Sequence, residues 1–221
     1  MPIAPSLTRI CGLLLPGIVP YKDAVVLQES YVKNIVAGRE RETFILLEHP
    51  HVITFGRGFH PENLLVSPDW LEANGVAVEE SGRGGDITYH GPGQVVGYPI
   101  LNLSGQSDLH LYLRNLEELM IRCVRDFGIE AGRKPGMTGI WVQDEKLGAI
   151  GVRVARWVTS HGFALNVNPD LKYFDYIIPC GIRQHGVTSM KKLLDRDIPV
   201  DEIHTCLVRH FEAIFQRKVI A

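Results

Sequence analysis

A glycine-rich stretch at residues 83–94 constrains this chain more than any other feature. It reads Arg-Gly-Gly-Asp-Ile-Thr-Tyr-His-Gly-Pro-Gly-Gln, with four glycines among twelve residues. Glycine loses more conformational freedom on folding than any other residue, so this density requires a structural reason. Left-handed turns and close approach of the main chain to a ligand are the usual ones. An ordinary turn between two strands is the alternative. We therefore expect a loop whose backbone lies against a bound molecule.

Length and composition favour one compact domain, residues 1–221. The 221 residues, 45% of them hydrophobic and 22% charged, are enough for a sizeable core without disulfides. The formal net charge of −2 gives no sign of nucleic-acid or membrane binding. No segment has the length of a membrane span, and the N-terminus lacks the pattern of a secretory signal. We expect a cytoplasmic protein.

Apolar spacing and helix-end signals predict four helices. Gly38 and Gly128 each follow an apolar stripe of helical period, and Ser67-Pro68 has the pattern of an N-cap followed by proline. Gly75 would end that short helix. The expected helices cover residues 23–37, 67–75, 109–127 and 199–216.

Runs of β-branched and aromatic residues predict seven strands. They cover residues 43–49, 52–55, 76–80, 95–101, 140–142, 147–154 and 157–167. The last two are expected to form a hairpin that turns near Ala155-Arg156. Because strands outnumber helices and do not alternate with them, we expect an α+β fold. Its mixed, largely antiparallel sheet would be flanked by helices.

The cysteines favour one candidate nucleophile. The four, at positions 11, 123, 180 and 206, form no CxxC, so neither a zinc site nor a disulfide framework is indicated. Cys123 and Cys206 fall on the inner faces of predicted helices and are expected in the core. Cys180 is the best nucleophile, because Pro179 fixes the approach of the chain and Gly181 leaves an unobstructed N–H beside the sulfur. A small buried cysteine at a strand end is the alternative.

An activated thiol needs a nearby cation. A thiol with a pKa near 8.5 is only about 3% ionised at pH 7, and lowering that pKa to roughly 7 takes about 2 kcal/mol. Lys146 is the candidate cation, because it follows the acidic turn Asp144-Glu145 and enters a strand of small residues. A solvated surface charge is the alternative for a lysine in that place.

Nucleotide and metal motifs are missing from the sequence. It contains no GxxxxGK[ST], and Gly91-Pro-Gly93 is followed at position 96 by valine where a dinucleotide motif needs glycine. It contains no HExxH, and the nine histidines do not assemble a recognisable metal set. We assign no cofactor and no metal.

Four ordered blocks give the chain a family resemblance. It is similar to the lipoyl(octanoyl) transferases of the LipB type in residues 83–94, in Lys146-Leu-Gly-Ala-Ile-Gly-Val152, in His161-Gly-Phe-Ala-Leu-Asn166, and in Pro179-Cys-Gly-Ile182 with Gly186-Val-Thr-Ser189. The resemblance runs from about residue 43 to residue 190, and it leaves the first and last predicted helices without distinctive motifs.

The resemblance implies a single catalytic domain with the fold of the biotin/lipoate protein ligase group. It implies an acyltransferase that takes an octanoyl group from octanoyl-acyl carrier protein and places it on a lysine of a lipoyl domain. That reaction is the first step of protein lipoylation from endogenous octanoate. The implied acceptors are lipoyl domains of 2-oxoacid dehydrogenase E2 subunits and the glycine cleavage H protein. The expected enzyme is a monomer that needs no cofactor and binds neither nucleic acid nor a membrane.

The resemblance also implies roles for individual residues. Cys180 carries the acyl group as a thioester, and Lys146 lowers the pKa of its thiol. The implied substrate-binding residues wall a narrow apolar slot, in which an eight-carbon chain gains about 0.8 kcal/mol per buried methylene. They are Arg83, Gly84, Gly85, Asp86, Ile87, Thr88, Tyr89 and His90, then Ala149, Ile150 and Gly151, then Gly162, Phe163 and Ala164.

The expected mechanism is thioester exchange followed by transfer to an amine, and neither step needs ATP. Lys146 is the candidate base for the acceptor amine, with His90 and His161 as runners-up that are otherwise hydrogen-bonded structural histidines. We expect Arg83 to anchor the loop or to meet the carrier's phosphate. Acyl carrier proteins are acidic, so basic residues form a candidate docking patch: Arg153, Arg156, Lys191 and Lys192.

Three other functions remain as alternatives. An ATP-dependent lipoate or biotin ligase shares the expected fold, although the Pro-Cys-Gly block favours a transferase. A cysteine hydrolase would release free octanoate without needing an acceptor. An acyl-binding module would hold the chain without covalent labelling.

Overall fold

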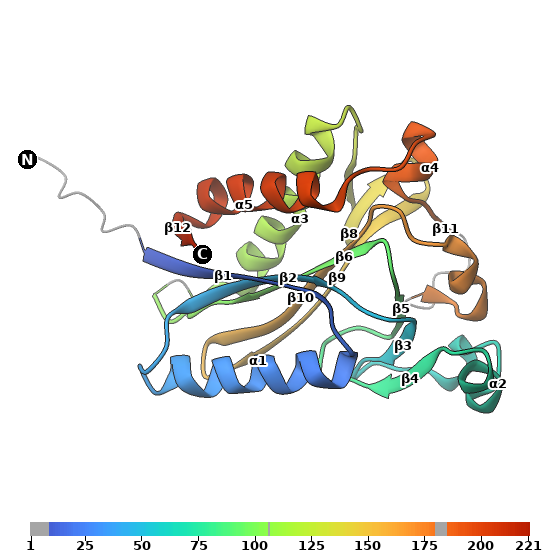
Figure 1. Cartoon of the computed structure of the whole chain (residues 1–221), viewed down its shortest axis with the longest axis horizontal. Helices are drawn as coiled ribbons and strands as arrows, with labels where there is room; N and C mark the ends of the chain where they lie inside the picture. Colours follow the sequence, from blue (N-terminus) through green and yellow to red (C-terminus); the bar gives the residue numbers. More distant parts are fainter. Residues whose placement is uncertain (1–8, 106, 180–184) are drawn as a thin grey trace, which may run out of the picture.

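One large mixed sheet organises the molecule (Figure 1). The computed structural model describes residues 9–105, 107–179 and 185–221. The order of its strands is β12 (Arg217–Ile220), β1 (Arg9–Ile18), β2 (Glu42–Glu48), β6 (Gln94–Ile100), β10 (Val158–Asn166), β9 (Glu145–Ala155), β8 (Met137–Val142) and β7 (Gly132–Lys134), with β11 (Gly186–Val187) beside β9. The pairs β2–β6, β6–β10, β10–β9, β9–β8 and β8–β7 are antiparallel, whereas β12–β1, β1–β2 and β11–β9 are parallel. The predicted mixed, largely antiparallel α+β architecture is confirmed.

Helices cover both faces of this sheet (Figure 1). Helix α1 (Tyr21–Val36) lies on one face, and α3 (Leu109–Asp126) and α5 (Val200–Phe215) lie on the other. Side chains alternate between the two faces of a strand, and β2 follows this rule. Phe44 and Leu46 pack in the core under α3 and α5, whereas Ile45 and Leu47 pack under α1. Both faces of the sheet are therefore buried at its centre.

A small second sheet stands at one end of the large one. Its order is β4 (Ala77–Glu80), β3 (Val52–Phe55) and β5 (Ile87–His90), and α2 (Pro68–Ala73) packs against it. The Ser67 side chain caps α2 by accepting a hydrogen bond from the Trp70 N–H at 3.3 Å, as the sequence predicted. Strand β5 lies inside the glycine-rich stretch, so part of that stretch is a strand rather than a loop.

The predicted helices and strands begin and end within a few residues of the observed ones. The turn of the predicted hairpin is displaced by one residue. Ala155 pairs with Val158, so Arg156 and Trp157 form the turn of the β9–β10 hairpin. Both adopt left-handed backbone angles, with φ of 51° and 62°. Two successive left-handed residues fit the twist of a tight hairpin. The turn therefore lies one residue later than expected.

Several elements were not predicted from sequence. Strand β12 pairs in parallel with β1, and this pairing joins the two ends of the chain, where local patterns carry no signal. Arg217 opens β12 and forms an ion pair with the largely buried Glu42, with Nε at 2.9 Å from Oε2. Strand β1, which is ten residues long, was not predicted either. Besides β5, the remaining unpredicted elements are short: η1 (Pro61–Asn63), β7, η2 (Leu171–Tyr176), β11 and α4 (Met190–Leu194).

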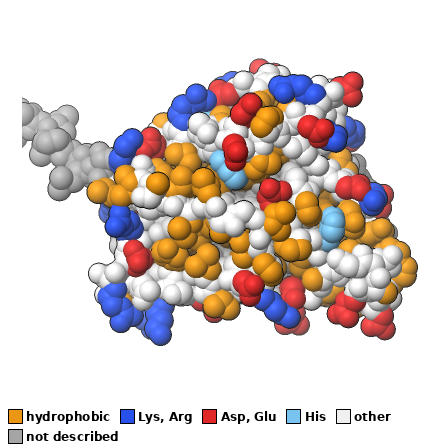
Figure 2. All heavy atoms as spheres, in the orientation of Figure 1, with side chains coloured by type: hydrophobic (Ala, Val, Ile, Leu, Met, Phe, Trp, Pro, Cys, Tyr) orange, Lys and Arg blue, Asp and Glu red, His pale blue; other side chains and the backbone are white. Residues whose placement is uncertain are grey.

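The surface carries both signs of charge. Figure 2 shows acidic and basic side chains interspersed with hydrophobic ones over the visible face, in keeping with the net charge of −2. Among the described residues, no helix combines the length and apolar character needed to cross a membrane.

The aromatic contact between α5 and β2 gives a first prediction. Phe211 is fully buried, and its ring stacks on Phe44 at 4.4 Å and on Phe215 at 4.7 Å between centroids. Phe211→Ala should lower the free energy of unfolding by about 3–5 kcal/mol, measured by urea denaturation. Glu202→Ala, at an exposed position of the same helix, should change it by less than about 0.5 kcal/mol. Equal losses in the two variants would contradict this packing.

Candidate active site

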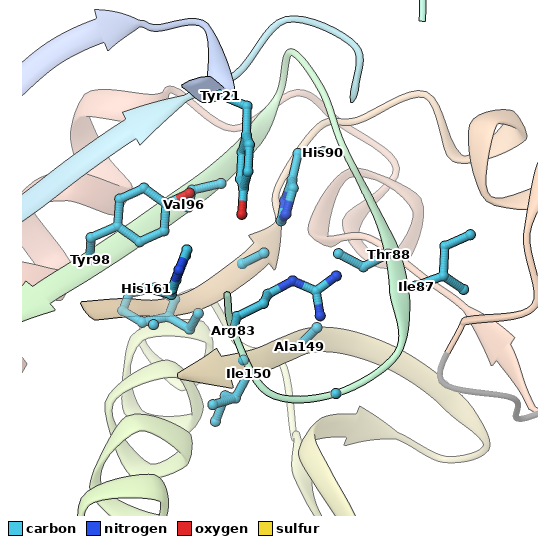
Figure 3. Close-up of a pocket in the computed structure, with 15 residues that line it drawn as sticks. Tyr21, Arg83, Ile87, Thr88, His90, Val96, Tyr98, Ala149, Ile150 and His161 are labelled. Carbon is cyan, nitrogen blue, oxygen red and sulfur yellow. The ribbon is translucent and has the colours of Figure 1, made fainter. Parts of the chain in front are cut away.

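A largely apolar pocket lies where the small sheet meets the large one (Figure 3). It brings together the predicted slot residues except Gly84, Asp86 and Tyr89. Tyr21 from α1, His90 from β5 and His161 from β10 reach it from three elements. The full lining is Tyr21, Arg83, Gly85, Ile87, Thr88, His90, Val96, Tyr98, Ala149, Ile150, Gly151, His161, Gly162, Phe163 and Ala164.

Arg83 anchors the loop that closes this pocket. Its side chain is buried, and its Nη2 donates to the Thr54 carbonyl oxygen at 2.7 Å and to Thr54 Oγ1 at 2.9 Å. The Gly84 N–H donates to the Val152 carbonyl oxygen of β9 at 2.9 Å, so the loop is tied to both sheets. Of the two roles expected for Arg83, this geometry favours anchoring.

Glycine is needed where the loop crosses β9. A Cβ at Gly151 would lie 2.9 Å from Arg83 Cδ and 3.0 Å from the Gly84 carbonyl oxygen. Gly85 has φ of 85°, a left-handed conformation that side chains disfavour. The glycine density read from the sequence is thus explained by close approach of two backbone segments as well as by the pocket.

Asp86 and Tyr89 point away from the pocket lining. Asp86 accepts hydrogen bonds from the His60 backbone N–H and the Asn63 side-chain amide. The Tyr89 ring is buried in the small-sheet core, and its hydroxyl lies 2.8 Å from His51 Nδ1. Gly84 contributes its backbone bond to β9 instead. These three predicted residues therefore support the pocket from outside.

Histidines around the pocket are buried and uncharged. Burial lowers the pKa of His49 to about 4, and burial together with Arg83 and Arg153 lowers that of His161 to about 4. Burial also holds the pKa of His90 well below its usual value. At neutral pH all three rings are therefore neutral.

Two of these rings are fixed by hydrogen bonds. His49 places Nδ1 2.6 Å from the Val19 carbonyl oxygen and Nε2 2.7 Å from the Tyr98 hydroxyl. Since a carbonyl only accepts, Nδ1 carries the proton and Nε2 accepts from Tyr98. His90 Nδ1 lies 2.7 Å from Gln94 Oε1 and donates to it by the same reasoning. Sequence reasoning missed His49 and Tyr98, because only the folded sheet brings them beside His90.

Lys146 lies in a second cavity that adjoins the first. The residue is only 9% exposed, and its Nζ lies 5.2 Å from the centroid of the Trp141 ring. The two cavities share the lining residues Thr88, Ala149 and Ala164. Lys146 is therefore buried beside the apolar pocket. The alternative interpretation of the sequence, a solvated lysine on the surface, does not fit this burial.

Gly139 makes room for the lysine side chain. A Cβ there would lie 2.9 Å from Lys146 Cε and 2.4 Å from the Gly148 carbonyl oxygen, and the residue has φ of 119°. Pro179 also lines the lysine cavity. The next residue in the chain is the candidate nucleophile Cys180, which lies outside the described residues.

Two side-chain amides that line the lysine cavity form a chain of hydrogen bonds. Gln94 Nε2 donates to Asn166 Oδ1 at 2.9 Å, and Asn166 Nδ2 donates to the Thr188 carbonyl oxygen at 3.0 Å. The Thr188 N–H in turn donates to the Lys146 carbonyl oxygen at 3.0 Å. These bonds hold the polypeptide that follows the Pro179-Cys-Gly block against β9.

Basic residues proposed for docking lie in two separate places and mostly in ion pairs. Arg153 lies 3.9 Å from Glu29, Lys191 lies 2.8 Å from Asp197, and Lys192 lies 2.7 Å from Glu145. Arg156 is in the turn of the β9–β10 hairpin. This arrangement does not single out one docking patch.

The buried histidines predict an acid-sensitive fold. As the pH falls below about 6.5, the unfolded chain binds a proton at His161 that the folded protein does not bind until about pH 4. Stability present above pH 6.5 is therefore lost on acidification, on the order of 1–2 kcal/mol for this histidine between pH 7 and pH 5. The free energy of unfolding of His161→Asn, measured by urea denaturation, should fall less over this pH range than that of wild type.

Asparagine tolerates the left-handed backbone of His161, whose φ is 56°. His110→Asn, at an exposed position of α3, should keep the wild-type pH dependence. A wild-type pH dependence in His161→Asn would contradict the neutral, buried state of this ring.

Comparisons of sequence place the chain among known proteins. The family model described as the lipoyl protein ligase A/B catalytic domain matches residues 20–212. A protein of Solibacter usitatus (strain Ellin6076) named octanoyltransferase is 49% identical over 213 residues, which are 96% of each chain. An octanoyltransferase of Rubrobacter xylanophilus is 47% identical over 202 residues, which are 90% of this chain and 91% of the relative.

Solved structures share the fold at much lower identity. A lipoate-protein ligase A bound with ATP superposes with a TM-score of 0.75 at 18% identity, covering 96% of this chain and 90% of its own. A putative lipoate protein ligase from T. acidophilum with bound lipoic acid gives a TM-score of 0.74 at 18% identity, covering 96% and 88%. At these identities the likeness shows the fold alone.

Proposed function

Because this chain belongs to the octanoyltransferases of the lipoyl protein ligase A/B catalytic domain family, we propose that it transfers an octanoyl group from octanoyl-acyl carrier protein to a lysine of a lipoyl domain. The family resemblance inferred from four motifs is confirmed. The proposal rests on one observation: an apolar pocket adjoins the cavity of a buried lysine. The two share the lining residues Thr88, Ala149 and Ala164.

An ATP-dependent ligase is not favoured. Relatives named octanoyltransferase are 45–50% identical to this chain, and several span nearly its whole length. The ATP-bound ligase structure shares only 18% identity, so it supports the fold and not the reaction. Acyl transfer between a thioester and an amine also needs no nucleotide.

In the proposed complex the octanoyl chain occupies the apolar pocket and its thioester carbonyl reaches the junction. Ala149 and Gly151 on β9 pair with Ala164 and Gly162 on β10, and these small residues leave room for a hydrocarbon chain over this part of the sheet. Each methylene removed from water stabilises the complex by about 0.8 kcal/mol. The pocket therefore binds the chain, and the lysine cavity is the place for the reaction.

The first proposed step moves the acyl group onto the enzyme. The Cys180 thiolate attacks the carbonyl carbon of the donor, and the bond from that carbon to the carrier's sulfur breaks. The departing carrier thiolate takes a proton from the Lys146 ammonium. This step leaves an acyl-enzyme thioester beside a neutral lysine amine.

The second proposed step forms the amide. The amine of the acceptor lysine attacks the acyl-enzyme carbonyl, and the Cys180 thiolate leaves. The proton released from the attacking nitrogen passes to the Lys146 amine, which restores the initial thiolate and ammonium. The low pKa values of His90 and His161 make those rings weak bases, which favours Lys146 for this role.

The proposed partners are an acyl carrier protein and lipoyl domains. As acceptors we propose the lipoyl domains of 2-oxoacid dehydrogenase E2 subunits and the glycine cleavage H protein. We also propose that the enzyme is a monomer.

Intact mass after incubation with octanoyl-acyl carrier protein tests the acyl-enzyme. Wild type should gain one octanoyl group that hydroxylamine removes, whereas Cys180→Ala should gain none. Cys11, Cys123 and Cys206 remain in that variant as internal controls, and all three are buried free thiols. A hydroxylamine-sensitive adduct on Cys180→Ala would contradict the proposed nucleophile.

Lys146→Met keeps an unbranched side chain but removes the cation and the base. Octanoyl transfer to a lipoyl domain should fall at least about 100-fold in kcat, the lower end of what a positioned acid or base contributes. A kcat within a few fold of wild type, in a variant with unchanged unfolding midpoint, would contradict the role of Lys146.

Ala149→Leu tests whether the pocket holds the acyl chain. The larger side chain takes the space of about two to three methylenes, worth roughly 2 kcal/mol, so kcat/KM for the octanoyl donor should fall about 30-fold. A butanoyl donor should be less affected. Ala155→Leu, on the same strand but outside both cavities, should behave like wild type. Equal effects on both donors would contradict this pocket.

A further inference from the structure

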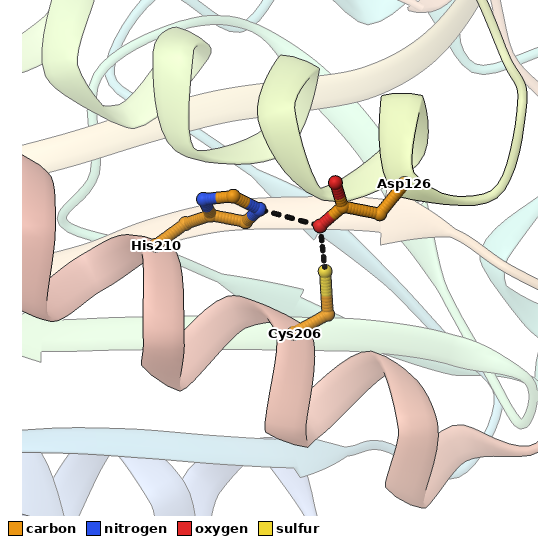
Figure 4. A group of neighbouring side chains, drawn as sticks. All are labelled: Asp126, Cys206 and His210. Atoms are coloured by element: carbon orange, nitrogen blue, oxygen red, sulfur yellow. Dashed lines mark hydrogen bonds and ion pairs between the residues drawn. The ribbon is translucent and has the colours of Figure 1, made fainter.

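A second cluster of reactive side chains lies between α3 and α5 (Figure 4). The Cys206 thiol donates to Asp126 Oδ2 at 3.1 Å, and His210 Nε2 lies 2.6 Å from the same oxygen. The sulfur, the imidazole nitrogen and the carboxylate oxygen all lie within 4.8 Å of one another. None of these residues lines the two cavities at the candidate active site.

We propose that Asp126, Cys206 and His210 form a binding site for a divalent metal ion of the zinc class. A thiolate, an imidazole and a carboxylate are the three ligand types that Zn²⁺ takes from proteins. Sulfur and nitrogen donors together favour this class over Mg²⁺ and Ca²⁺, which prefer oxygen. A water molecule would complete a tetrahedral set.

Helical geometry presents these ligands to one point. Cys206 and His210 are four residues apart on α5, so their side chains lie one above the other on the same face. Asp126 is the last residue of α3, the helix that packs across from that face. Figure 4 shows the carboxylate directed at both α5 side chains.

The two separations that involve the Asp126 oxygen need only a small adjustment. Tetrahedral zinc with these ligands separates the donor atoms by about 3.3–3.6 Å, given bond lengths near 2.0 Å to nitrogen and oxygen and 2.3 Å to sulfur. The observed separations of 3.1 Å and 2.6 Å are those of hydrogen bonds. A movement of less than about 1 Å by the Asp126 side chain, at a helix end, would open them to coordination distances.

The cluster has an entry path, and its carboxylate already binds a cationic side chain. Cys206 is 5% exposed, whereas the side chains of His210 and Asp126 are 17% and 38% exposed, so one side faces solvent. The Arg209 guanidinium already pairs with Asp126 and lies 3.7 Å from Cys206 Sγ. Its side chain is 66% exposed, so it is free to move into water when a metal ion takes its place. Cys206 would release its proton on binding.

Such a site would fasten α5 to α3 and would not take part in acyl transfer. No metal was assigned from the sequence, because the cysteines form no CxxC and the histidines assemble no recognisable metal set. Only the packing of the two helices adds Asp126 to Cys206 and His210. The expected effect of metal is therefore on stability and not on the chemical step.

Cobalt absorption spectroscopy tests this site directly. The full-length chain is used in a Cys180→Ala background, so that the proposed catalytic thiol does not bind metal, and is freed of metal with a chelator. Titration with Co²⁺ should produce the d–d bands of tetrahedral Co²⁺ and a thiolate charge-transfer band. Both should stop growing at one equivalent of metal. Cys206→Ser should lose the charge-transfer band, and His210→Ala should weaken binding at least about tenfold.

His110→Ala is the matched control, since it removes an exposed imidazole from α3 away from the cluster. It should bind Co²⁺ like the parent protein. In the same series Zn²⁺ should raise Tm of the parent and of His110→Ala but not of His210→Ala. Unsaturable binding, which would mark an adventitious ion only, would overturn the proposal. So would a charge-transfer band kept in Cys206→Ser or a Tm increase kept in His210→Ala.

Discussion

The buried guanidinium of Arg83 holds the glycine-rich loop between the two sheets, and the pocket depends on that contact. It donates two hydrogen bonds to Thr54 in the small sheet, while the adjacent Gly84 bonds to Val152 in the large one. Leaving a buried guanidinium without acceptors is costly, so loop and sheets stabilise one another. The absence of a side chain at Gly151 lets the loop approach β9 closely enough for these bonds to form.

The same sheet that supports the pocket also supports the lysine. Strand β9 contributes Lys146 near its start and the small residues Ala149 and Gly151 further along, so one strand passes from the lysine cavity to the apolar pocket. The amide chain from Gln94 through Asn166 fixes the segment after Cys180 against this strand. The apolar pocket thus adjoins a cavity that holds a buried lysine, which is the arrangement on which the proposed acyl transfer rests.

The sequence predicted the parts of this arrangement that depend on local pattern. The β9–β10 hairpin, the long helices and the small-residue wall are encoded in neighbouring positions, and the motifs identified the family. The pairing of β1 with β12 and the approach of His49 to His90 join residues distant in the chain. The space that Gly139 leaves for Lys146 and the cluster at Asp126 depend on packing in the same way. No local period signals such contacts.

We propose that the apolar pocket and the Lys146 cavity form one acyl-transfer site. A crystal structure of the acyl-enzyme, prepared with octanoyl-acyl carrier protein and no acceptor, would test this proposal. We expect electron density for the acyl chain running from Cys180 past Thr88, Ala149 and Ala164 into the pocket, with the thioester carbonyl facing Lys146. Density for the chain on any other path, or a carbonyl remote from Lys146, would contradict it.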